Sequence, residues 1–171
     1  AHEADCLYSG IVIDTNNFMT KTGVRTFEAA AYLRRAGADV TRVRKLFRDD
    51  VAEYKAKAEA VREAEIYRNL YAISTCTSEG IQSPTVVGAQ AANELLNIKG
   101  IRASFVMTEY QGLVYVSARS IDEVNVQVIM ERLGGGGHMN AAGAQIDHTD
   151  VKEAVKVLKE LIDEAEKKGG I

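Results

Sequence analysis

Residues 133–143, LGGGGHMNAAG, decide the fold, and four consecutive glycines stand in front of His138. Glycine lacks a side chain and reaches positive φ, so a ligand can approach the backbone and successive N–H groups can turn toward one point. Such a concave run of donors binds anions, phosphate above all, and His138 can donate a further hydrogen bond. The alternative is a flexible linker, but linkers are usually mixtures of glycine and serine. The stretch therefore predicts a phosphate-binding loop over residues 134–138.

The glycine run is expected to join a helix to a short strand. The helix covers about residues 122–133, and the strand covers residues 141–146. A final helix follows, capped by Thr149 or Asp150, because apolar residues recur there at intervals of three and four. That apolar stripe consists of Val151, Ala154, Val155, Leu158, Leu161, Ile162 and Ala165. We interpret it as core packing and assign it no function.

The segments before the glycine run alternate between strands and helices. Strands are expected over residues 70–76, 102–109 and 113–120, the last two forming a hairpin around Gln111 and Gly112. The single proline, Pro84, suits the first turn of a helix that continues to Leu96. Further helices are expected over residues 1–15, 25–37, 41–47 and 50–68, although residues 11–13 could instead form a short buried strand. The helix from Asp50 is rich in alanine, lysine and glutamate, which favours a partly solvated connector.

Length and composition describe one ordinary globular domain or two small ones. The chain has 171 residues, of which 46% are hydrophobic and 26% are charged. A net charge of −3 argues against a broad DNA-binding surface but permits a local phosphate pocket. Two cysteines are too few for a disulfide framework, which favours the cytoplasm. No apolar run approaches the roughly 20 residues of a membrane span, so no membrane contact by this chain is expected.

Five motifs together resemble one family. The sequence GGGGH at 134–138 is followed by Asn140 and Gly143, and this pattern resembles the DHH-associated domain of the DHH family of phosphoesterases. The motifs SARS at 117–120 and NVQVIM at 125–130 are similar to the bacterial cyclic-di-AMP phosphodiesterase branch. GIVIDT at 10–15 resembles the last metal-ligand motif of the DHH domain, and RTFEAA at 25–30 fits the same branch. The motifs occur in family order along almost the whole chain.

The resemblance implies an α/β fold with two parts. Residues 1–65 would be a truncated, mainly helical remnant of the DHH domain together with a connector helix. Residues 66–171 would be a DHH-associated domain, in which a mixed β-sheet flanked by helices binds the substrate.

Hydrolysis of a phosphodiester requires an activated water and neutralisation of charge on phosphorus, and two divalent ions supply both. The resemblance implies Mn²⁺, two ions in the intact parent, with Asp14 as a metal ligand and catalytic residue. On spacing alone, Asp14 would be interpreted as a helix cap or an Asx turn. The family's Asp-His-His motif has no counterpart among the three histidines of this chain. This chain alone is therefore predicted to be inactive.

The resemblance also implies which residues line the nucleotide pocket: Arg119, Asn125, Gly134, Gly135, Gly136, Gly137 and His138. The planar fork of Arg119 suits a phosphate, although a surface charge at a strand end is the alternative. Asn125 could instead cap the following helix, and both roles remain open for it.

The function implied is hydrolysis of cyclic-di-AMP to linear pApA, with this chain supplying the substrate-binding lobe. The alternatives are an oligoribonuclease or nucleotide phosphatase of the DHH family, or a non-catalytic nucleotide-binding or nucleic-acid-binding module. The resemblance implies a cytoplasmic protein or the cytosolic part of a membrane-anchored one. A homodimer is also expected, because Leu7, Ile11 and Phe27 would expose apolar surface.

Overall fold

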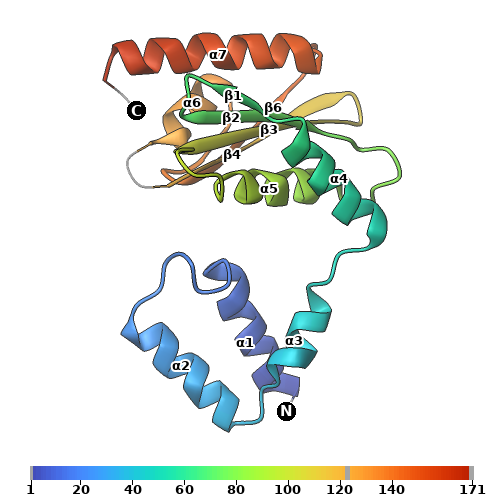
Figure 1. Ribbon diagram of the computed structural model, residues 1–171, viewed down its shortest axis with the longest axis vertical. Coiled ribbons are helices and arrows are strands. Elements are labelled where there is room, and N and C mark those ends of the chain that lie inside the picture. The colour runs from blue at the N-terminus through green and yellow to red at the C-terminus, as the bar shows by residue number, and fades with distance from the viewer. Residues whose placement is uncertain (1, 122–123, 170–171) are drawn as a thin grey trace. The chain divides into compact units, whose positions relative to one another are not determined.

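The computed structural model describes residues 2–121 and 124–169. The chain divides into two compact units, Ala1–Asp49 and Asp50–Ile171, whose elements Figure 1 labels. The first unit contains α1 (His2–Asp14), α2 (Val24–Arg35) and α3 (Val40–Leu46). Residues 11–13 continue α1, so the helical interpretation is confirmed over the strand.

The core of the first unit is small. It consists of the buried residues Ala4, Tyr8, Ala30, Leu33, Ala38 and Val43. Leu7 and Phe27 remain 64% and 54% exposed, as expected from the sequence. Ile11 was also expected to be exposed, but it packs against this core and is half-buried.

The second unit is built on a mixed sheet, as the sequence predicts, and the sheet has six strands. Its strands are β1 (Glu65–Tyr67), β2 (Tyr71–Cys76), β3 (Ala103–Tyr110), β4 (Leu113–Ser120), β5 (Gly136–His138) and β6 (Ala141–Ile146). Their spatial order is β1-β2-β3-β4-β6-β5. Strands β2 and β3 are parallel, and every other neighbouring pair is antiparallel. The parallel pair requires a crossover, which α5 (Pro84–Leu95) provides.

Helices cover both faces of this sheet (Figure 1). On one face, α6 (Val126–Arg132) and α7 (Val151–Lys167) pack against the larger core, around Phe105, Met107 and Leu158. On the other face, α4 (Val51–Arg62) and α5 pack against β2 and β3 through a second core that includes Ala60, Ala91 and Val106. The side chain of Asp150 accepts a hydrogen bond from the Glu153 N–H at 2.8 Å, which confirms the predicted cap of α7.

Two predicted boundaries around α4 are corrected. The helix ends at Arg62 instead of continuing to Arg68, and strand β1 follows at once. The chain turns back through Arg68 and Asn69, whose φ values are 51° and 59°. No glycine marks this turn, so the sequence does not reveal it. Helix α4 packs against α5 and β2, so the unit boundary lies at Asp49 and not after residue 65.

Two further differences concern the segment around the glycine run. Helix α6 begins at Val126, later than the predicted start, and residues 122 and 123 lie outside the described residues. The run itself is not a loop throughout, because residues from Gly136 onward form the edge strand β5. Among the helices described, none is both long and apolar enough to cross a lipid bilayer.

Candidate functional site

The candidate site is the part of the sheet face that α5 leaves uncovered. Residues directly opposite each other on antiparallel strands have their side chains on the same face. The pairing of β4, β6 and β5 therefore sets three rows of residues side by side on this open face: Arg119–Ala141–His138, Ser117–Gly143–Gly136 and Tyr115–Gln145.

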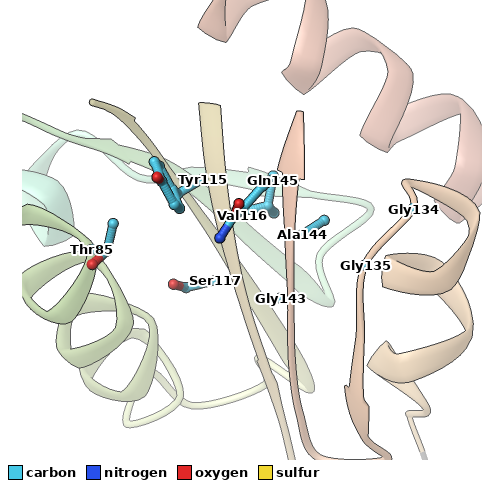
Figure 2. Close-up of a pocket in the computed structure, with 9 residues that line it drawn as sticks. All are labelled: Thr85, Tyr115, Val116, Ser117, Gly134, Gly135, Gly143, Ala144 and Gln145. Atoms are coloured by element: carbon cyan, nitrogen blue, oxygen red, sulfur yellow. The ribbon is translucent and has the colours of Figure 1, made fainter. Parts of the chain in front are cut away.

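Helix α5 borders this open face on one side. Two contacts show that its backbone lies close to β3. The Ser104 hydroxyl on β3 donates to the Ala92 carbonyl on α5 at 2.6 Å. A Cβ added to Gly88 on α5 would lie 2.4 Å from the hydroxyl oxygen of Thr108 on β3. Beside the first turn of α5 lies a cavity of about 580 Å³. It is lined by Thr85, Tyr115, Val116, Ser117, Gly134, Gly135, Gly143, Ala144 and Gln145 (Figure 2). Serine and glycine in its floor let a ligand lie close to the backbone.

Arg119 and His138 lie on the same face of the sheet, although neither is among the residues that line the cavity. They share the first row with Ala141, which lies between them. Arg119 is half-buried, and its Nη1 donates to the Ala118 carbonyl at 2.9 Å. Burial lowers the pKa of its guanidinium, and within the described ranges no carboxylate pairs with it. His138 is exposed at the open edge of the sheet.

A half-buried cation without a counter-ion is costly. An anionic ligand would supply the negative charge that no described residue places against Arg119, and it would use the planar donor fork of the guanidinium. Arg119 is therefore the side chain of this face whose surroundings most favour phosphate.

The glycine run differs from the concave set of donors that the sequence predicts. The Gly134 N–H donates to the Glu131 carbonyl at 3.0 Å, and the Gly135 N–H donates to the Met130 carbonyl at 2.8 Å. With a φ of 79° at Gly134, this is the Schellman motif that ends α6. At least these two of the four donors are thus used inside the protein, and Gly136 and Gly137 belong to the ladder with β6. Within the run, φ is positive at Gly134 and Gly137 but not at Gly135 or Gly136.

Asn125 serves as the N-cap of α6. Its side-chain oxygen accepts a hydrogen bond from the Gln127 N–H at 3.1 Å. The helix it starts packs on the covered face of the sheet, through Val126, Ile129 and Met130. The structure therefore shows the capping role, which is one of the two roles considered from the sequence. Asn125 is not among the residues that line the cavity.

Asp14 is the last residue of α1 in the first unit, and it is exposed. The turn after it is unusual, because Asn16, Asn17 and Phe18 have φ values of 46°, 57° and 64°. The buried Thr15 hydroxyl holds this turn by accepting from the Phe18 N–H at 3.0 Å. A left-handed conformation at a bulky residue is strained, and such strain clusters at functional sites.

A metal pair does not fit the residues described here. Across residues 2–121 and 124–169, no three His, Cys, Asp or Glu side chains lie close enough together to hold a metal ion. Asp14 can serve as one oxygen ligand of a hard cation, but one carboxylate does not make a site for two.

Sequence reasoning missed the side chains that line most of the cavity, Thr85, Tyr115, Ser117 and Gln145. A signal for two of them was present in the predicted strand 113–120. There Tyr115, Ser117 and Arg119 alternate with Val114, Val116 and Ala118, which are buried in the core of the other face. Period-two alternation places the first three on one side of the sheet.

Comparison with known proteins identifies the second unit. The family model described as the DHHA1 domain matches residues 71–164. The exopolyphosphatase-related protein from Bacteroides fragilis superposes with a TM-score of 0.84 at 22% identity, over 95% of this chain and 50% of that one. This likeness concerns the fold alone.

Two longer bacterial proteins resemble the chain at the level of sequence. The cyclic-di-AMP phosphodiesterase PdeA of Listeria monocytogenes is 45% identical over 162 residues, and the cyclic-di-AMP phosphodiesterase GdpP of Geobacillus thermodenitrificans is 46% identical over 161 residues. Each match covers 94% of this chain but 24% of the relative, so the chain spans about a quarter of their length. The chain belongs to the DHHA1 domain family.

Proposed function

We propose that this chain is the substrate-binding part of a phosphodiesterase that hydrolyses cyclic-di-AMP to linear pApA. The observation that carries the proposal is the identity of 45% and 46% to two cyclic-di-AMP phosphodiesterases over 94% of the chain. The open sheet face supports it, because its small-residue floor lies beside an arginine that pairs with no carboxylate among the described residues. The reaction would take place in the cytosol, on a free protein or on the cytosolic part of a membrane-anchored one.

On this proposal, Arg119 and His138 hold the phosphate. The guanidinium donates to non-bridging phosphate oxygens through charge-assisted hydrogen bonds, which are stronger than neutral ones. The His138 imidazole donates from the other end of the same row. Gly143 and Gly136 form the next row and leave room for the sugar.

The chemical step is proposed to depend on Mn²⁺, with two ions in the active enzyme and Asp14 as one ligand. When bound, such ions supply an activated water and neutralise charge on the phosphate. The described residues bind and orient the substrate, and no step of bond cleavage is assigned to them.

The binding proposal is tested by titrating cyclic-di-AMP into ¹⁵N-labelled protein and following amide resonances. A charge-assisted bond contributes roughly 1.5–3 kcal/mol, so Arg119→Ala should weaken binding about ten- to a hundredfold. Arg62→Ala is the matched control, because Arg62 is an exposed arginine on α4 that pairs with Glu59. Its loss should leave affinity unchanged. Resonance shifts confined to residues other than Thr85 and residues 115–145 would show that this face is not the binding site.

Hydrolysis gives a second test. Incubated with cyclic-di-AMP and excess Mn²⁺, this chain should bind but show no turnover by chromatography, because Asp14 alone cannot hold two ions. In the intact enzyme, Asp14→Ala should abolish activity and leave substrate binding by the second unit in place. Turnover by the isolated chain that persists in Asp14→Ala and in the presence of chelator would exclude this role for Asp14.

A further inference from the structure

One end of the open face is aromatic. Tyr115 is half-buried in the third row, directly opposite Gln145 on β6. The ring of Tyr110 lies 6.4 Å from that of Tyr115, tilted by 48°. Figure 2 shows Tyr115 and Gln145 at the same end of the cavity, on neighbouring strands. Within the described part of the chain, neither side chain is engaged in a hydrogen bond, so both can serve a ligand.

The three rows follow the order of the parts of a nucleotide. Arg119 and His138 define the anionic end, Ser117 and Gly143 the small-residue middle, and Tyr115 the aromatic end. Arg119 lies four residue steps along an extended strand from Tyr115, about 13 Å at the usual rise. The long Arg119 side chain covers part of that span, and a nucleoside monophosphate covers the rest.

We propose that Tyr115 and Gln145 form the base subsite of this face and that this subsite selects adenine. The inference rests on the proposed function and deepens it by naming the residues that would recognise the adenine base. The base stacks on the Tyr115 ring, as bases stack on aromatic side chains in nucleic-acid-binding proteins. Opposed residues have their Cβ atoms about 5 Å apart, so the Gln145 carboxamide reaches the edge of that base.

The carboxamide of Gln145 distinguishes the purines. It offers one acceptor and one donor side by side, and we assign it to the N7 edge of the base, where adenine presents the complementary pair, the donating N6 amino group next to the N7 acceptor. Guanine presents two acceptors, O6 and N7, along the same edge. The glutamine oxygen would then face an acceptor and lose its hydrogen bond, so guanine binds more weakly.

The experiment titrates AMP, GMP and ribose 5-phosphate into the full 171-residue chain, with affinities from amide shifts. Ribose 5-phosphate carries the phosphate and sugar but no base, so it measures the anionic end alone. AMP should bind about five- to a hundredfold more tightly than ribose 5-phosphate, the usual gain from stacking one base. AMP should also bind more tightly than GMP.

Two variants locate the subsite. Tyr115→Leu keeps an apolar side chain in the half-buried position, and it should lower AMP affinity to that of ribose 5-phosphate. Gln145→Ala alters an exposed residue and should remove the preference for AMP over GMP. Gln127→Ala is the matched control, because Gln127 lies on α6, which packs on the opposite face of the sheet. It should change neither the AMP affinity nor the preference for AMP over GMP.

The outcomes separate the two proposals. If ribose 5-phosphate binds but AMP gains nothing over it, the base subsite is wrong and the phosphate site stands. Equal AMP and GMP affinities in the unaltered chain would overturn the adenine assignment. If neither AMP nor ribose 5-phosphate binds, both proposals fail.

Discussion

At the scale of the residue, the glycines of the run differ in how closely other backbone approaches them. A Cβ on Gly135 would lie 2.1 Å from the Gly143 carbonyl oxygen, and one on Gly137 would lie 2.5 Å from the Ala142 Cα. Gly136 has open space around it. We therefore expect Gly135→Ala and Gly137→Ala each to lower the free energy of unfolding by about 1–3 kcal/mol, as overpacked sites do.

Gly136→Ala is the matched control, because it sits in the same strand without a close neighbour. Its free energy of unfolding should stay within about 0.5 kcal/mol of the unaltered protein. Urea unfolding followed by circular dichroism measures all three. Equal destabilisation by the three variants would mean that strand flexibility, and not close backbone approach, explains the glycines.

At the scale of the element, the role of Asn125 in α6 can be separated from a role in binding. Its side chain caps the helix through the Gln127 N–H. Asn125→Ala should cost about 1 kcal/mol of stability, the usual loss for an N-cap, whereas Asn125→Asp keeps an accepting oxygen and should cost little. Thermal unfolding of the two variants measures the difference.

The same two variants decide whether Asn125 also contacts substrate. If it only caps α6, Asn125→Asp should bind cyclic-di-AMP as the unaltered chain does. A carboxylate placed against the phosphate would instead repel it. A clear loss of affinity for cyclic-di-AMP in a folded Asn125→Asp protein would show that Asn125 does contact the substrate.

At the scale of the whole molecule, each unit has a buried core of its own, and the small first core is supplemented by an ion pair between the buried Asp5 and the exposed Arg42. The Asp5 carboxylate is 6% exposed and accepts from Arg42 Nε at 2.8 Å and from the Asp39 N–H at 2.7 Å. The Arg42 hydrogen bond, followed by that from Asp39, holds the pKa of Asp5 below its ordinary value.

The sign of the pH dependence follows from that lowered pKa. In the unfolded chain, Asp5 titrates near a pKa of about 3.9. Its contribution to stability is therefore present above about pH 4 and is lost as the pH falls through the lower folded-state pKa. Amide resonances of residues 2–49, followed during acid titration, should report a steeper fall in stability below about pH 4 than in a variant that lacks this titration.

Asp5→Asn is that variant. It should be less stable at neutral pH, because Arg42 loses its partner, but its stability should fall less steeply below pH 4. Glu3→Gln, an exposed position on the same helix, is the control. A change in the resonances of the second unit at neutral pH would show that the two units do not unfold separately.

The sequence by itself determined the elements whose signals are local. The apolar period and Asp150 set α7, Pro84 set the start of α5, and the Gln111–Gly112 turn set the β3–β4 hairpin. Helix periodicity and capping depend on residues within one or two turns, so no distant partner is needed to recognise them. The glycine-histidine motif was also sufficient to indicate the family of the second unit.

The tertiary structure decided what depends on distant partners. The strands β1 and β5 are too short to persist without the longer strand beside each of them. Arg119 and His138 share a face only because β6 pairs with both of their strands. The sequence indicates Arg119 and His138 as candidate binding residues, but the face of the sheet on which a side chain lies is set by strand register. Register is fixed when the whole sheet forms, and with it the open face that holds the candidate site.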